Sequence, residues 1–236
     1  MMNATTRPAP ASTRGPRPEL FTPIHKAIRL AMSDVLARLG GTDFADDAAS
    51  RAATAELRQV LLFCGSHLEH EERFVKPAAV ERLPGGVVEA FEEHAEQALV
   101  VGELRALADA VDGAGPSTRT VTAHSLYLHF SRFVAQNLAH MADEEQVLAP
   151  LLERFFTPAE ILEVHGRIQA AITPEERRIS GPYMLRACSP GERRFLVAAM
   201  LKVAPKEAVM AALGSFRGAV PDATIDDLLA FCGGAS

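Results

Sequence analysis

The chain has 236 residues, 48% of them hydrophobic and 23% charged, a length that allows one large domain or one domain with a smaller addition. No apolar stretch approaches the roughly 18 residues of a membrane-spanning helix, so collagen-like, disordered and membrane classes are excluded and a soluble globular protein is expected. The net charge is −6 and Lys and Arg do not cluster, which argues against nucleic acid as a partner.

The start of the chain and the cysteines bear on its location. Residues 1–20 are rich in proline and arginine, and they are predicted to form a disordered tail. No apolar segment of about 7 to 15 residues follows this basic start, so a secretory signal is not expected. The three cysteines are far apart and form no C-x-x-C pair, which favours a reducing cytoplasm over a disulfide framework or a thiolate zinc site.

From Phe21 onward, apolar residues recur at helical spacing without an alternating strand pattern, and an all-α protein is predicted. Long helices are expected over about 23–39, 47–76, 87–111 and 118–149, separated by glycine- and proline-containing breaks at 40–41, 83–86 and 112–116. Four long helices joined by short or moderate loops are typical of an up-and-down four-helix bundle, here assigned to residues 21–156.

Residues 157–236 have a different pattern and are predicted to form an additional C-terminal set of short helices. Three capping boxes with proline at the first helical position begin at Thr157, Thr173 and Ser189, and Pro205 and Pro221 precede two more helices. The apolar residues expected to pack together there, or to cover the bundle, are Phe195, Leu196, Met200, Leu213, Phe216, Leu228, Leu229 and Phe231.

One pattern, H-x-x-x-E-E-x-φ-φ-x-P with φ an apolar residue, occurs twice at a distance of 73 residues, from His67 to Pro77 and from His140 to Pro150. It suggests two repeated helical hairpins. Spacing of i, i+4 places His67 with Glu71, and His140 with Glu144, on one helix face.

Both His–Glu pairs fall within the apolar stripe of their helix. The first stripe includes Leu57, Leu61, Cys64 and Phe74, and the second includes Leu126, Phe130, Phe133, Asn137, Val147 and Leu151. Buried carboxylates are costly unless they are paired, protonated or bound to a cation.

The first and third helices each add one histidine to their own stripe, His25 and His94. Four helices therefore direct four histidines and two glutamates inward. Imidazole nitrogen with carboxylate oxygen suits iron, manganese or zinc, and two facing carboxylates can bridge a metal pair.

At this point the chain resembles the hemerythrin-like, or HHE cation-binding, domains over about Phe21 to Glu153. The resemblance implies a four-helix bundle with a non-haem centre of two iron ions. It also implies the ligands: His25, His67, His94 and His140 would be terminal, and Glu71 and Glu144 would bridge.

Two positions depart from the oxygen-carrying members of that family. Those carriers have a further histidine where this chain has Ala98, and their last carboxylate ligand lies one residue later, at Glu145 here. With Ala98, about one position on each octahedral ion would stay open, which resembles the iron-sensing and nitric-oxide-stress members more than the reversible carriers.

We therefore expect a di-iron protein that binds or senses dioxygen or nitric oxide, or that handles iron, with manganese or zinc as other candidate metals. An oxidoreductase acting on peroxide, dioxygen, nitric oxide or an organic substrate is the first alternative. A zinc-bound or metal-free structural module is the second. Cys64 is more often a small apolar filler than a redox group; Glu72 and Glu145 are either partners of the ligands or exposed, with Glu145 as the reserve ligand.

Overall fold

A computed structural model describes residues 20–83 and 88–234. The predicted disordered tail, apart from Leu20, lies outside these residues, as do Val87 and most of the break before it. Within the two ranges all regular secondary structure is helical, with one isolated β-bridge between Arg217 and Val220, so the all-α prediction is confirmed. None of the described helices is long and apolar enough to cross a lipid bilayer.

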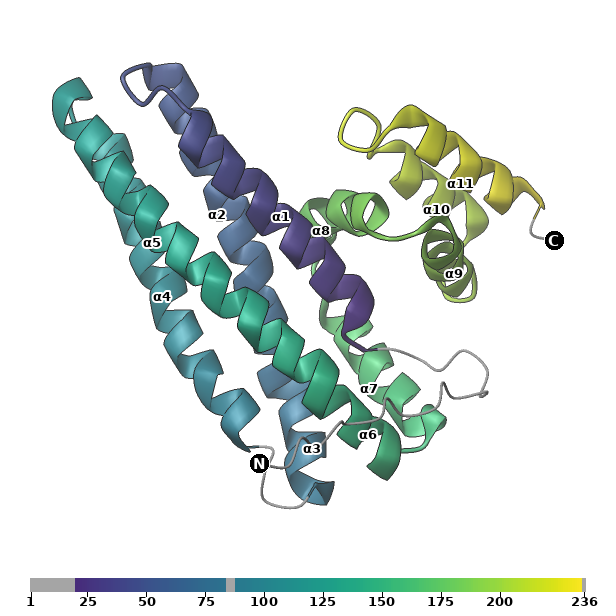
Figure 1. Cartoon of the computed structure of the whole chain (residues 1–236). Coiled ribbons are helices and arrows are strands. Elements are labelled where there is room, and N and C mark those ends of the chain that lie inside the picture. The colour runs from purple at the N-terminus through teal and green to yellow at the C-terminus, as the bar shows by residue number, and fades with distance from the viewer. Residues whose placement is uncertain (1–19, 84–87, 235–236) are drawn as a thin grey trace, which may run out of the picture.

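Four long helices lie side by side (Figure 1): α1 (Thr22–Gly41), α2 (Asp47–His70), α4 (Val88–Gly113) and α5 (Pro116–Asp143). The helices α1 and α4 each pack against both α2 and α5, so every long helix contacts two others. Successive helices run in opposite directions, which brings the start of α1 and α4 level with the end of α2 and α5.

The ends of α2 and α5 continue past a widened turn. A π-helical turn η1 (Glu71–Val75) leads into α3 (Lys76–Arg82), and η2 (Glu144–Leu148) leads into α6 (Ala149–Phe155). In each turn a backbone N–H, that of Lys76 or Ala149, donates to the carbonyl five residues earlier. Such turns occur frequently at functional sites, and both of these begin at a glutamate of the repeated pattern.

The π turn also explains a wrong prediction. Val147 was expected in the apolar stripe, but it is 57% exposed and Leu148 is buried instead. Because the turn inserts one residue relative to an α-helix, the buried face shifts by one position, and Leu152 rather than Leu151 lies in the core beyond it.

The buried apolar residues of the long helices form two clusters. The inner cluster lies between α1, α2, α4 and α5 and includes Ile28, Leu61, Val101 and Phe133. The end cluster lies around α3, α6 and α7 and includes Phe21, Phe74, Val75, Phe91, Leu148, Leu152 and Val164. The repeated histidines and glutamates fall between these two clusters along each helix.

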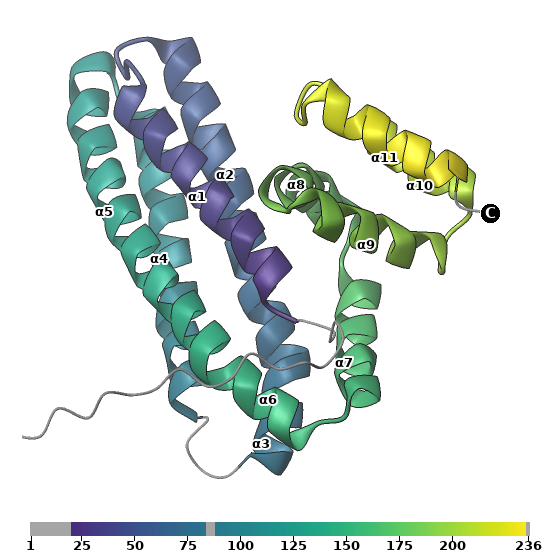
Figure 2. The same cartoon turned by 45° about the vertical axis from the view of Figure 1, so that its right-hand side comes forward.

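The C-terminal helices are α7 (Pro158–Ala171), α8 (Pro174–Ala187), α9 (Pro190–Leu201), α10 (Lys206–Gly214) and α11 (Asp222–Gly234). All three predicted capping boxes are present, and α10 and α11 begin directly after Pro205 and Pro221. The helix α7 packs against η1, and α8 packs against α1 and α2 (Figure 2).

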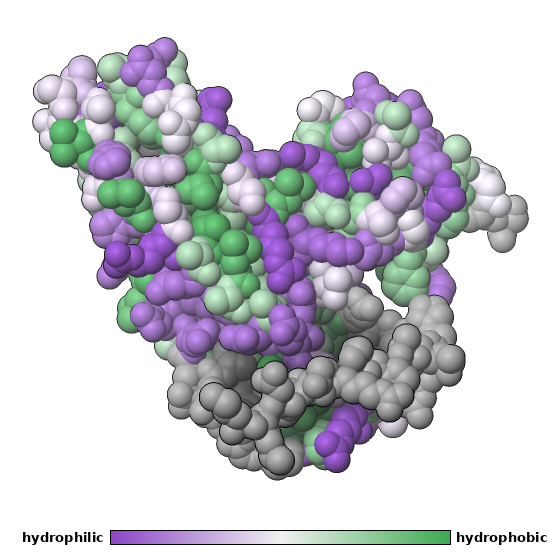
Figure 3. Space-filling view, viewed as in Figure 1, coloured by the Kyte–Doolittle hydropathy of each residue, from purple (hydrophilic) through white to green (hydrophobic). Residues whose placement is uncertain are grey.

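The helices α9–α11 pack mainly on one another, around a third cluster of their own. Leu213 and Leu228 are buried in it as expected, whereas Phe195 and Met200 are exposed. The space-filling view shows a notch between this part and the upper ends of the long helices (Figure 3). Contact between the two parts therefore depends largely on α8.

The contact of α8 with the C-terminal part gives a testable prediction. A methyl group at Gly181 of α8 would overlap the ring of Phe216, so Gly181→Ala should lower the free energy of unfolding by about 1–3 kcal/mol. Gly166→Ala in α7 is the matched control, because the added carbon meets no described atom within 4 Å beyond its chain neighbours and its own helix backbone. Alanine favours helix by about 1 kcal/mol at both positions, so the difference between the variants reports the overlap with Phe216. Urea denaturation of both variants measures this, and equal stability of the two would contradict the packing.

Candidate metal centre

Four histidine side chains from four helices converge at one level of the long helices. The Nε2 atom of His25 (α1) lies 3.2 Å from that of His67 (α2), and the Nε2 atom of His94 (α4) lies 3.0 Å from that of His140 (α5). His25, His94 and His140 are buried, and His67 is nearly so, with 11% of its side chain exposed. The histidines thus form two pairs.

Two glutamates lie between the histidine pairs, each with one oxygen toward either pair. Oε1 of Glu71 is 3.3 Å from Nε2 of His67, and its Oε2 is 3.6 Å from Nε2 of His94. Glu144 is arranged in the same way, with Oε2 3.3 Å from His25 and Oε1 3.4 Å from His140. Both carboxylates therefore span the two histidine pairs, which is the geometry of bridging ligands.

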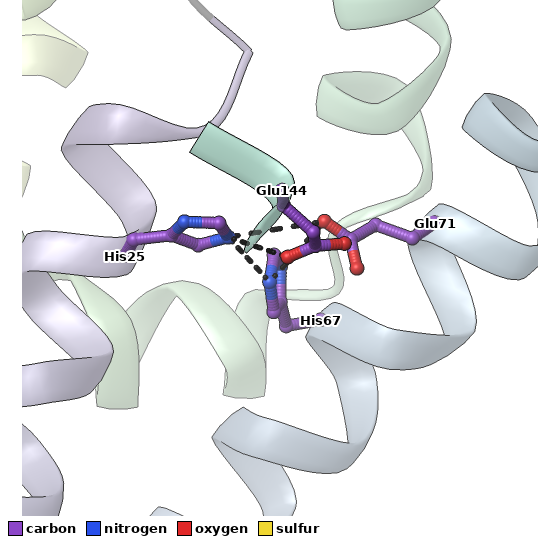
Figure 4. A group of neighbouring side chains, drawn as sticks. All are labelled: His25, His67, Glu71 and Glu144. Carbon is purple, nitrogen blue, oxygen red and sulfur yellow. Dashed lines mark hydrogen bonds and ion pairs between the residues drawn. The ribbon is translucent and has the colours of Figure 1, made fainter. Parts of the chain in front are cut away.

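These six residues make two overlapping groups, each able to hold a metal ion. His25, His67, Glu71 and Glu144 form the first group (Figure 4), and His94 and His140 form the second with the same two glutamates. The ligand atoms of each group lie within 4.8 Å of one another. The structure therefore brings together all six residues singled out in the sequence.

Three further glutamates hold the histidines from outside. Nδ1 of His25 donates to Glu145 at 3.0 Å, Nδ1 of His94 donates to Glu72 at 3.0 Å, and Nδ1 of His140 donates to Glu93 at 3.1 Å. We call Glu72, Glu93 and Glu145 the outer carboxylates. Such partners fix the ring orientation and make the other nitrogen a better metal ligand.

The repeat explains how two of these contacts arise. The second glutamate of each pattern reaches the histidine of the other hairpin, so Glu72 of η1 contacts His94 and Glu145 of η2 contacts His25. Glu145 is also held by Arg29 at 2.8 Å, and Glu72 by Lys76 at 2.8 Å. The two hairpins are thus cross-linked around the site in the same manner.

The tautomers fixed by the outer carboxylates leave lone pairs facing one another. A neutral imidazole with its proton on Nδ1 has an acceptor at Nε2. Because Nδ1 of His94 and of His140 each donates to a carboxylate, their two Nε2 lone pairs would meet at 3.0 Å. A positive charge between them, a proton or a metal ion, is required to make this arrangement favourable.

The two glutamates between the histidine pairs, Glu71 and Glu144, have the same requirement. None of their four carboxylate oxygens accepts a hydrogen bond from a described residue, and Glu71 and Glu144 are 3% and 0% exposed. Burial beside the Glu144 carboxylate raises the pKa of Glu71 well above its ordinary value. Burial also acts to raise the pKa of Glu144, but the imidazoles of His140, His25 and His94 outweigh it and the pKa is lowered.

His67 is already in the form that binds metal. Burial, reinforced by the neighbouring His25, lowers the pKa of His67 well below its ordinary value and keeps the ring neutral. Metal binding needs neutral imidazole and ionised carboxylate. This donor set, with its unpartnered buried oxygens, fits a metal ion.

Some positions near the centre differ from expectation. Ala98 is exposed, so it does not face the histidines, and the buried position one turn after His94 is Gln97. The apolar stripe of the third helix includes Phe91, Val101 and Leu104, and the gap in it between His94 and Val101 was the available signal for Gln97. Glu93, which directly precedes His94, was also missed because nothing in the sequence distinguishes it from an ordinary exposed glutamate.

Cys64 lies one turn before His67 in the inner cluster. Burial raises the pKa of its thiol to about 12, so it stays protonated and unreactive at neutral pH. This agrees with its interpretation as a small apolar filler.

Known proteins add no assignment to this geometry. A comparison with protein-family models gives no match, and a comparison with curated proteins gives none either. The metal centre therefore has to be judged on its own residues.

Proposed function

We propose that this chain is a hemerythrin-like four-helix bundle whose six inward residues hold two iron ions, and that it binds or senses dioxygen or nitric oxide, or handles iron. The observation that carries the proposal is the pair of four-residue groups that share Glu71 and Glu144. A single ion would leave the second pair of imidazoles without a positive charge. Two ions account for all six side chains.

Iron is favoured over other metals by the ligand set. Mixed imidazole and carboxylate ligands with shared carboxylates suit a redox-active pair, whereas a structural zinc ion is most often held by cysteine thiolates or cysteine with histidine. Four protein ligands for each ion are fewer than the six of an octahedral site. Positions for a small exogenous ligand therefore remain on each ion.

The chain contributes to such an iron pair in three ways. The outer carboxylates orient the histidines, the bridging glutamates hold a fixed separation, and the inner and end clusters exclude water on both sides. When bound, iron would supply open coordination positions and a reversible change of oxidation state. Elemental analysis combined with visible absorption after exposure to air tests the metal, because zinc has no redox chemistry or d-d colour.

Metal content should depend on the bridging glutamates and not on their exposed neighbours. Glu71 and Glu144 each belong to both four-residue groups, so Glu71→Ala and Glu144→Ala should each lose metal from both positions. Glu69 is exposed near the end of α2, and Glu69→Ala should keep the metal. Elemental analysis of the three purified variants measures this. Equal metal content in all three variants would show that Glu71 and Glu144 are not metal ligands.

Removing a bridging charge should have opposite effects on the two forms of the protein. In the metal-free form, Glu71→Gln should raise the free energy of unfolding, because the raised pKa of Glu71 reflects the cost of an ionised carboxylate buried beside Glu144, and an amide carries no charge. In the loaded form the same change should lower the melting temperature, since a ligand is lost. Melts with and without a chelator measure both.

The matched control for this inversion is Glu69→Gln, which should change neither form appreciably. Chelation should also destabilise the unmodified chain, by about 2.7 kcal/mol if free metal had been present at 100 times its dissociation constant. A melt that is unchanged after verified metal removal would show that the core closes equally well over an empty site.

The outer carboxylates should tune affinity without being ligands themselves. Glu72→Ala and Glu145→Ala should each weaken metal binding by roughly 10- to 100-fold, and Glu103→Ala, exposed on α4, should have no effect. Competition with a chromophoric chelator measures the affinities. If Glu145→Ala removed metal as completely as Glu144→Ala, Glu145 would be a direct ligand, as the resemblance to oxygen carriers allows.

A further inference from the structure

The near-symmetry of the six ligand candidates ends one helical turn deeper in the bundle. Toward the inner cluster, the buried residues one turn from the His25–His67 pair are Ile28 on α1 and Cys64 on α2. Beside the His94–His140 pair they are Gln97 on α4 and Asn137 on α5. One half of the centre thus adjoins an aliphatic chain and a thiol, and the other half adjoins two amides.

The two amides are not equivalent in their hydrogen bonding. Nδ2 of Asn137 donates to the carbonyl of Phe133 in its own helix at 2.9 Å. Oε1 of Gln97 is buried and has no hydrogen-bond partner among the described residues, although the residue is only 6% exposed. An amide oxygen left unpaired in this way costs free energy.

The position of this unpaired group is informative. Among the described residues, the buried carboxylate or amide oxygens without a partner are those of Glu71, Glu144 and Gln97. An i, i+3 spacing places Gln97 on the same face of α4 as His94. The unpaired amide therefore lies on the face that carries the ligand candidates and not in a remote part of the core.

We propose that the side-chain amide of Gln97 is the hydrogen-bond partner of an exogenous ligand on the metal ion held by His94, His140, Glu71 and Glu144. This inference rests on the proposed function. It makes the His94–His140 half the site of ligand binding, and it makes Gln97 a specificity-determining residue. The ligand is water or a small anion, because the residues one turn deeper are buried and only Gln97 and Asn137 among them carry amides.

An amide suits both kinds of ligand. It has an acceptor oxygen for the O–H of a bound water and N–H donors for an anion, and half a turn about its last bond exchanges them. Direct coordination by Gln97 is the competing role. It is less favoured because the ligand atoms of the four residues are already grouped within 4.8 Å, while Oε1 of Gln97 makes no hydrogen bond to either histidine.

Azide binding to the iron-loaded, oxidised full-length chain tests the proposal. Optical titration should give an azide dissociation constant about tenfold higher for Gln97→Leu than for the unmodified chain, the factor that corresponds to a hydrogen bond of ~1.4 kcal/mol. The infrared stretching frequency of bound azide should also shift in this variant. Ile28→Leu, the matched change on the other half, should alter neither quantity.

Two further measurements keep the test decisive. The metal-free Gln97→Leu protein should melt no lower than the unmodified chain, since no hydrogen bond to a described residue is lost. Gln97→Met, whose side chain has nearly the same length, repeats the titration if the leucine variant folds poorly. Elemental analysis of each variant should give the same metal content as the unmodified chain.

The possible failures are distinguishable. If the unmodified chain takes up no metal, both the proposed function and this inference are wrong. If metal binds but azide affinity and stretching frequency are unchanged in the Gln97 variants, or change in Ile28→Leu instead, only the inference is wrong. Loss of metal from the Gln97 variants would make Gln97 a metal ligand and overturn the proposed role.

Discussion

Two carboxylates buried face to face impose the main constraint on this protein. Glu71 and Glu144 lie in the interior without a hydrogen-bond donor from the described residues, surrounded by four imidazoles of which at least two meet through their lone pairs. This arrangement is costly in an apolar interior unless positive charge is present. Much of the surrounding structure serves to hold these carboxylates and imidazoles together. Metal ions are the simplest source of the missing positive charge.

The surrounding structure meets this constraint from both sides and from outside. The inner and end clusters close the site along the helix axes, and Phe21 and Phe91 pack against the rings of His25 and His94 at 5.5 and 5.3 Å between centroids. The outer carboxylates then orient the imidazoles at their far nitrogens. The polar layer is thus enclosed by apolar layers and anchored at the half-exposed rim.

Sequence reasoning recovered the helices and the six ligand candidates because both depend on periodicity. Helical spacing put His67 and Glu71 on one face, and the repeat fixed the matching pair on the other hairpin. The same reasoning failed at Val147, because a π turn changes the phase of the helix without a compositional signature. It also missed Gln97, a polar residue inside an apolar stripe, because the sequence does not show that its amide oxygen has no partner among the described residues.

The two π turns have a consequence for engineering this motif. Each divides its helix into a part before the ligand glutamate and a part beyond it that is out of phase by one residue, with Pro77 or Pro150 marking the start of the second part. Copying the six ligands onto ideal, uninterrupted helices would shift the face beyond each turn by one residue and would turn Ala79 and Leu152 away from the end cluster. A minimal version of the centre therefore has to retain the extra residue in both helices, since the spacing of the ligands and the closure of the core below them are encoded separately.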